Sequence, residues 1–258
     1  MFKTLCSCAV FLASAMSAHA ASVTLYDQDF ESPSGYVNNF GSGYSDLSQQ
    51  TVNSLYANQP AGFSFAQDFT VETLLLTGSQ AFGTGYNDPT GQGGNYALGM
   101  LGSAQDDRLG LSFNLGKFKF FNFKLDISSI GLHNGPGAPF ASASDVPEFK
   151  FTLYDNPLGT PSTSGNGAVL DSGSLTGTAS ALDTLDWTTG TFAFDASQST
   201  NGNVTLQVDL VKGGYAAFDN FLITASDTPG GGLTPVPLPA AGWMLLAGLG
   251  GLAAMRRR

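Results

Sequence analysis

Between positions 21 and 234, apolar residues alternate with polar ones in short runs, and no segment keeps the 3.6-residue period of an amphipathic helix. The clearest runs are residues 117–127 (KFKFFNFKLDI), 148–155 (EFKFTLYD) and 203–211 (NVTLQVDLV). Clusters of Gly, Asn, Asp, Ser and Pro separate the runs at intervals of about ten residues. This pattern predicts an all-β domain over residues 21–224, a two-sheet β-sandwich of the jelly-roll kind.

The other expected strands are residues 22–30, 63–71, 73–77, 96–101, 108–115, 168–175, 187–195 and 216–224. Within 117–127, Phe118 and Phe120 have the opposite parity to Phe121 and Phe123. Because side chains alternate between the faces of a strand, this pattern predicts a bulge near Phe120 that lets all four rings reach one core.

Residues 1–20 have the three parts of a secretory signal peptide, namely an early Lys3, an apolar run and the small-residue triplet Ala18-His19-Ala20. Cleavage is therefore expected before Ala21. The two cysteines of the chain lie inside this peptide, so the mature chain forms no disulfide. It must be stabilised by core burial or by a bound ion.

The exported part is strongly acidic. All 20 Asp and Glu and only six of the ten Lys and Arg lie between positions 21 and 234, which leaves a net charge of −14. Nucleic acid is excluded as a partner, because binding it requires a positively charged surface. An acidic surface suits an extracellular medium with divalent cations, although solubility alone explains it equally well.

The C-terminal part begins with residues 225–235 (ASDTPGGGLTP), which predict a flexible linker. Residues 236–258 then combine a Pro-rich start, an apolar stretch over 240–255 and a cluster of arginines. As a helix, 240–255 would span about 24 Å, slightly less than the roughly 30 Å of a hydrocarbon core. A single transmembrane helix is expected there, with the arginines on the cytoplasmic side. An ordinary C-terminal anchor is one interpretation.

The same stretch resembles the PEP-CTERM class of bacterial sorting signals, in its VPLPA variant. The matching residues are Val236, Pro237, Leu238, Pro239 and Ala240, with Arg256, Arg257 and Arg258 at the end. The resemblance implies an exosortase, a membrane-embedded cysteine transpeptidase, as processing partner. It further implies export through the inner membrane, transient anchoring, and delivery to the cell envelope, surface or extracellular matrix. It does not say what the exported domain does.

Few residues suggest catalysis. His133 is the single histidine between positions 21 and 234, and neither G-x-S-x-G, H-E-x-x-H nor a P-loop pattern occurs. Zinc would require clusters of His or Cys. Glycoside hydrolysis needs only two carboxylates, but Glu31, Glu72 and Glu148 each stand alone in the sequence. We therefore expect no enzyme, with a polysaccharide-active hydrolase or lyase as the alternative.

Asp27, Asp29 and Glu31 alternate at the end of the first expected strand, where like charges repel unless they are well solvated or share a cation. Asp29-Phe30-Glu31 and the late pair Asp219-Asn220 resemble the two ends of jelly-roll carbohydrate-binding modules. In that family the first and last strands close around a structural calcium ion. The resemblance implies one Ca²⁺ with Glu31 and Asp219 as ligands and Asp29 as a third candidate. The alternative is that Asp219 begins or caps a turn.

Together these features predict an exported, exosortase-sorted protein of the envelope or exopolysaccharide that is non-catalytic and binds polysaccharide. A purely structural matrix component is a further alternative. Sugar rings stack on exposed aromatic side chains, and the candidates for such a platform are Tyr36, Tyr44, Tyr56, Tyr86 and Tyr96.

Overall fold

The computed structural model describes residues 21–38, 44–45, 50–56, 64–67, 71–77, 86–100, 107–130, 146–178, 181–213 and 215–233. Residues 21–235 form one compact unit. The predicted signal peptide, the sorting signal with its transmembrane helix, and His133 lie outside the described residues. Among the residues that are described, no helix is long and apolar enough to cross a membrane.

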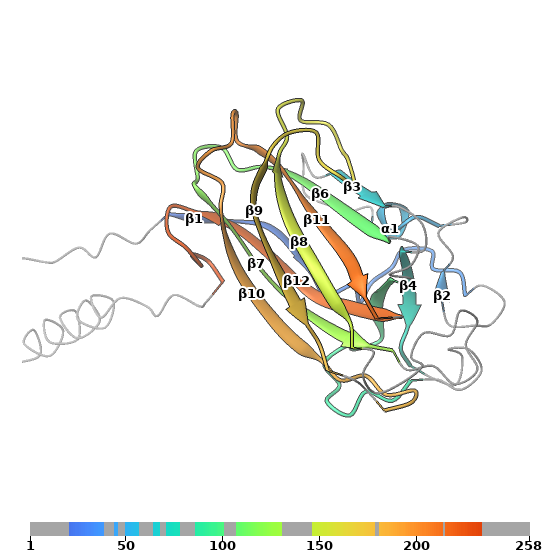
Figure 1. The fold of residues 1–258 in the computed structure, drawn as a ribbon. Coiled ribbons are helices and arrows are strands. Elements are labelled where there is room, and N and C mark those ends of the chain that lie inside the picture. Colours follow the sequence, from blue (N-terminus) through green and yellow to red (C-terminus); the bar gives the residue numbers. More distant parts are fainter. Residues whose placement is uncertain are drawn as a thin grey trace, which may run out of the picture. The chain divides into compact units, whose positions relative to one another are not determined.

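This unit is the predicted all-β sandwich of two antiparallel sheets (Figure 1). The seven-stranded sheet has the order β10 (Thr188–Asp195), β7 (Phe120–Ser129), β12 (Ala216–Ser226), β5 (Tyr96–Met100), β4 (Val71–Leu75) and β2 (Tyr44–Ser45), with β1 (Ser22–Gln28) also paired to β12. The five-stranded sheet has the order β3 (Ser64–Gln67), β6 (Arg108–Asn114), β11 (Asn203–Lys212), β8 (Glu148–Asp155) and β9 (Val169–Thr176). From β5 onward the chain crosses repeatedly between the two sheets, as in a jelly roll.

One short helix, α1 (Val52–Leu55), was not expected from the sequence. Thr51 caps it, because its side chain accepts a hydrogen bond from the backbone N–H of Ser54. Val52 and Leu55 are buried in the core. A single turn of this kind is too short to leave a 3.6-residue period in the sequence.

Phenylalanine rings fill the space between the sheets. Phe123 of β7 is fully buried, and its ring centroid lies 4.8 Å from that of Phe192, 5.1 Å from that of Phe151 and 5.2 Å from that of Phe194. These rings come from β10 and β8, so β7 links both sheets through one aromatic cluster. Aromatic pairs at such distances add to the stabilisation that burial alone provides.

The bulge predicted near Phe120 is wrong. Strand β7 begins at Phe120, and its pairing with β10 runs without a register shift to Ile127. Phe118 lies in the preceding turn, where its N–H donates to Leu115 O at 3.2 Å, and its ring packs on the core from there. A turn therefore redirects Phe118, and Phe120 belongs to the outer face of β7 together with Asn122.

The linker predicted from Ala225 also begins later than expected. Strand β12 continues to Ser226, and residues 227–233 fold back onto the outer face of the larger sheet. We call residues 227–233 the C-terminal clasp. The fully buried side chain of Asn122 holds it, because Oδ1 accepts from Gly230 N at 2.7 Å and Nδ2 donates to Gly231 O at 3.2 Å.

Candidate functional site

Strand β12 changes its neighbour halfway along one edge. Residues 216–218 pair with β5, whereas residues 221–226 pair with β1. Asp219 and Asn220 fall in the gap between the two partners. On the opposite edge, the register with β7 shifts between Asp219 and Leu222. The chain after β1, which carries Asp29 and Glu31, starts beside this gap.

The shift is a bulge centred on Asn220, which has a φ of +51°. Asn tolerates this left-handed backbone region better than most residues. The extra residue turns both Phe218 and Phe221 into the core, where each is fully buried. Asp219 therefore lies on the outer side of the sheet, directly opposite Asp126 of β7.

Asp126 and Asp219 are both buried, at 3% and 1% exposure. Asn220 connects them, because its N–H donates to Asp219 Oδ1 at 2.7 Å and its Nδ2 donates to Asp126 Oδ2 at 2.9 Å. The second Asp126 oxygen accepts a short hydrogen bond from Thr189 Oγ1. Asn220 Nδ2 also donates to Gln92 O at 3.2 Å, which ties the bulge to the loop before β5.

Burial raises the pKa of the Asp219 carboxyl from 3.8 to about 8. The Asn220 N–H works in the opposite direction, and the negative charges of Glu31, Asp126 and Asp29 then raise the pKa further. The structure therefore brings Glu31, Asp29 and Asp219, the three residues singled out in the sequence, into one electrostatic neighbourhood. It adds Asp126, which the sequence analysis missed.

Glu31 holds the loop that leads into β5. Its Oε1 accepts from Asn95 N at 2.7 Å and Tyr96 N at 3.1 Å, and its Oε2 accepts from Asn95 Nδ2 at 2.8 Å. A Cβ on Gly94, which has a φ of +55°, would lie 2.2 Å from Glu31 Oε1. The positive φ favours glycine at position 94, and a larger residue would displace the Glu31 carboxylate from its hydrogen bonds. Asp29 Oδ1 in turn accepts the N–H of Glu31 at 3.1 Å.

Asp88 fixes the shape of the same loop. Its carboxylate accepts from Gly91 N at 3.0 Å, Gly93 N at 2.8 Å and Trp187 Nε1 at 3.2 Å. These hydrogen bonds hold the pKa of Asp88 below its usual value although partial burial opposes them. The Trp187 ring packs so closely on Gly93 that a Cβ there would lie 2.4 Å from it. Asp88 and Trp187 thus position the backbone that Glu31 and Asn220 contact.

Among the described residues, no three or more His, Cys, Asp or Glu side chains are arranged to hold a metal ion. Calcium does not require three carboxylates, because it also accepts backbone carbonyl and amide oxygens. Asp219, Glu31 and Gln92 O are oxygen donors of that kind around the bulge. The site therefore fits calcium in donor chemistry, although the Glu31 oxygens already accept three hydrogen bonds.

The four candidate tyrosines whose side chains are described do not form the expected aromatic platform. Tyr56 is buried and donates its hydroxyl to Phe30 O at 2.8 Å. Tyr36 and Tyr96 are partly buried and pack edge to face with ring centroids 5.1 Å apart. Tyr86 packs with Trp187 on a small apolar cluster outside the larger sheet. The side chain of Tyr44 lies outside the description.

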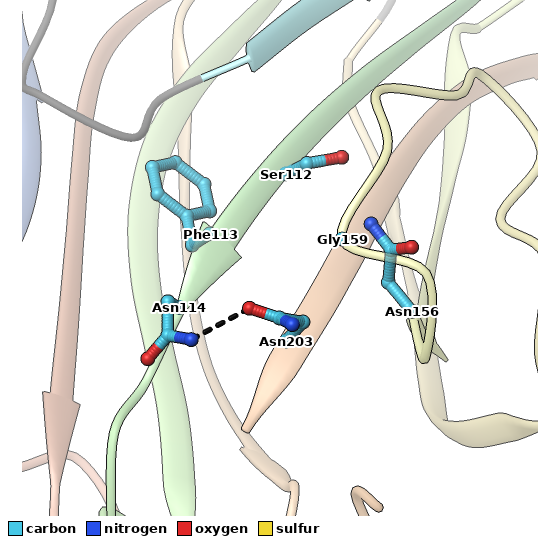
Figure 2. Close-up of a pocket in the computed structure, with 6 residues that line it drawn as sticks. All are labelled: Ser112, Phe113, Asn114, Asn156, Gly159 and Asn203. Atoms are coloured by element: carbon cyan, nitrogen blue, oxygen red, sulfur yellow. Dashed lines mark hydrogen bonds between the residues drawn. The ribbon is translucent and has the colours of Figure 1, made fainter. Parts of the chain in front are cut away.

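A polar cavity of about 40 Å³ opens on the five-stranded sheet, where β6 and β11 meet the loop after β8 (Figure 2). Its lining residues are Ser112, Phe113, Asn114, Asn156, Gly159 and Asn203. Asn114 Nδ2 donates to Asn203 Oδ1 at 2.6 Å across the rim. None of the lining residues is acidic. The cavity was not predicted, because its asparagines occur at strand ends, where asparagine is common for turn formation alone.

Neither a protein-family model nor a curated protein sequence matches the chain. Similar solved structures include the K3 adhesin domain of Lys-gingipain from Porphyromonas gingivalis, with 12% identity, a TM-score of 0.40 and coverage of 79% of this chain and 99% of that one. The C-terminal family 22 carbohydrate-binding module of Clostridium thermocellum Xyn10B has 11% identity and a TM-score of 0.40. The match covers 80% of this chain and 96% of that module. TmCBM61, solved in complex with β-1,4-galactotriose, has 12% identity and a TM-score of 0.31. The match covers 63% of this chain and 88% of that one. At these values the likeness carries no argument about function.

Proposed function

We propose that this chain is an exported, exosortase-sorted surface protein that binds neutral extracellular polysaccharide without transforming it. The observation that carries the binding function is the cavity of Figure 2, which is lined by amide and hydroxyl groups and by no carboxylate. Such groups donate to and accept from sugar hydroxyls. The net charge of −14 over the exported part favours neutral glycans over anionic ones.

The buried carboxyls support this assignment over a hydrolase or lyase. Glycoside hydrolysis requires two carboxyl groups that flank the bond to be cleaved. Asp126 and Asp219 are almost fully buried, and both oxygens of Asp126 are hydrogen-bonded within the protein. This pair is therefore closed to a sugar chain and serves the structure around the bulge.

Residues 21–235, which form a compact unit with their own core, are expected to bind at least one neutral polysaccharide on a glycan array. Anionic polysaccharides should bind more weakly at low salt, and added salt should reduce this difference because it screens surface charge. Array binding to neutral and acidic polysaccharides at two salt concentrations is the measurement. Absence of binding to every neutral polysaccharide would overturn the binding function.

We also propose one structural calcium ion held by Asp219 and Glu31, with Asp29 as the third candidate and backbone oxygens completing its shell. The strongest charges that act on buried Asp219 are all negative, so a cation there would relieve their repulsion. The ion would connect β12 to the chain that follows β1 and so limit fraying of the domain ends.

The calcium site predicts a characteristic dependence on pH. Without calcium, Asp219 is ionised above about pH 4 in the unfolded chain but keeps its proton up to about pH 8 in the folded one. The folded state binds more protons in this window, so in chelator the free energy of unfolding should fall as pH rises towards 8. Calcium competes with that proton, so its stabilising effect should increase with pH.

Thermal unfolding at pH 6 and 8, in chelator and in calcium, measures both effects. At a hundredfold excess over Kd, calcium should stabilise the domain by about 2.7 kcal/mol, a rise in melting temperature of several degrees. Asp219→Asn should abolish this response, whereas Asp27→Asn, at an exposed position of β1, should retain it. Equal calcium responses of wild type and Asp219→Asn would refute the site.

A further inference from the structure

The amide of Asn156 is held in one orientation beside the cavity of Figure 2. Its Nδ2 donates to Thr160 O at 2.9 Å and to Thr205 Oγ1 at 3.1 Å. Because a backbone carbonyl can only accept, the nitrogen must face Thr160 and the oxygen must face elsewhere. Asn156 is only 1% exposed, and its Oδ1 accepts no hydrogen bond from the described residues. The Oδ1 atom is itself buried, so a group in the cavity meets Asn156 at its other atoms.

Two hydrogen-bonded hydroxyl groups, those of Thr205 and Ser112, connect this amide to the cavity. Thr205 Oγ1 accepts from Asn156 and lies 2.9 Å from Ser112 Oγ. Thr205 is fully buried, and Ser112 is the described acceptor within reach of its proton. Either hydroxyl can donate to the other, and when Thr205 donates, the proton of Ser112, which lines the cavity, is free to donate into it.

Asn203 provides a second donor at the rim. Its Oδ1 accepts from Asn114, which leaves Nδ2 directed toward Gly159. A Cβ at Gly159 would lie 3.3 Å from that nitrogen, and its φ of +64° already favours glycine. Residue 159 thus leaves space in front of an amide donor.

The volume limits what can enter. One water requires about 10–15 Å³ of such space, so the cavity of about 40 Å³ accepts small groups and excludes a whole sugar ring. The ring would remain outside, near the loop that carries Leu158, whose side chain is 74% exposed. Sugar rings combine hydroxyl groups with apolar C–H faces, which match this combination of polar cavity and exposed leucine.

We propose that this cavity is a subsite for a single hydroxyl or hydroxymethyl group of a neutral glycan. A hydroxyl both donates and accepts, so it can accept from Asn203 Nδ2 and hydrogen-bond to the hydroxyl of Ser112. The inference rests on the proposed polysaccharide binding. It adds the place on the domain where the glycan binds and the chemical group of the glycan that enters the cavity.

The test uses residues 21–235 with cellohexaose, xylohexaose and mannohexaose as neutral probes, followed by NMR of the asparagine side-chain amides and by calorimetry. At least one probe should shift the Asn156 and Asn203 amide signals. Asn203→Asp keeps the oxygen that accepts from Asn114 and replaces the donor with an acceptor, so the affinity should fall about three- to tenfold. Ser112→Ala should weaken binding by a similar factor.

Asn166→Asp is the matched control, because it makes the same change of charge at an exposed asparagine of the neighbouring loop. It should bind the probe as the wild type does. If a probe or an array polysaccharide binds while these amide signals stay fixed and Asn203→Asp retains full affinity, the subsite is wrong and the proposed function stands. If no neutral glycan binds, both are wrong.

Discussion

Replacing Asn122 with alanine is expected to destabilise the β-sandwich domain by about 2–3 kcal/mol, because it removes the side chain that holds the C-terminal clasp. Asn122 is fully buried on β7 and binds Gly230 N, Gly231 O and Ser226 Oγ at 2.7, 3.2 and 2.7 Å. Without it, the Gly230 N–H loses its acceptor in a half-buried position. The midpoint of urea unfolding measures the loss.

Hydrogen exchange distinguishes local opening of the clasp from a loss of stability of the whole domain. In Asn122→Ala, the amide of Gly230 should exchange faster than amides in the centre of β11, because the clasp opens locally before the sheets do. Asn166→Ala, which removes an exposed amide, should change stability by less than about 0.5 kcal/mol. A wild-type exchange rate at Gly230 in Asn122→Ala would show that other contacts hold the clasp.

The clasp also shortens the connection between the domain and the proposed sorting signal. The sequence predicted a flexible linker over residues 225–235, but residues up to 233 lie on the sheet. Only Thr234 and Pro235 then separate the clasp from Val236. Two residues span at most about 7 Å, whereas the nine residues 227–235 would span about 30 Å if the clasp opened.

Alternating patterns predicted most strands closely, because one buried face imposes a period of two. Residues 148–155 form β8 as expected, and β5, β6 and β11 differ by at most one residue from prediction. The bulge in β12 also left a signal, since Phe218 and Phe221 are three apart and cannot both be inward without an extra residue. The sequence analysis overlooked that spacing.

The remaining features depend on which strands become neighbours, and local patterns do not contain this information. Asp126 faces Asp219 only because β7 pairs with β12 in one particular register. The cavity asparagines come from β6, β11 and the loop after β8, and only the order of the smaller sheet brings them together. Asn122 binds Gly230 and Gly231, which lie 108 and 109 positions later in the sequence, so the pattern around it does not predict its burial.

Replacing both Pro237 and Pro239 with alanine is expected to abolish sorting of the full-length chain. The two prolines belong to the VPLPA motif that the exosortase would read, and each fixes its backbone φ near −65° in a stiff segment before the apolar stretch. Alanine removes both the rings and this constraint while leaving the hydrophobic segment and Arg256–Arg258 intact. In an exosortase-positive host, the variant should remain full-length in the inner membrane fraction, whereas the wild type should be processed and released.

Pro235→Ala is the control, because Pro235 lies immediately before the motif and outside it. This variant should be processed like the wild type, which separates recognition of the motif from a general need for proline near the membrane. In a host without exosortase, the wild type should itself stay full-length in the membrane, because the apolar stretch still anchors it. Cleavage and release of the double variant in the exosortase-positive host would show that residues 236–258 are an ordinary anchor and that the sorting assignment is wrong.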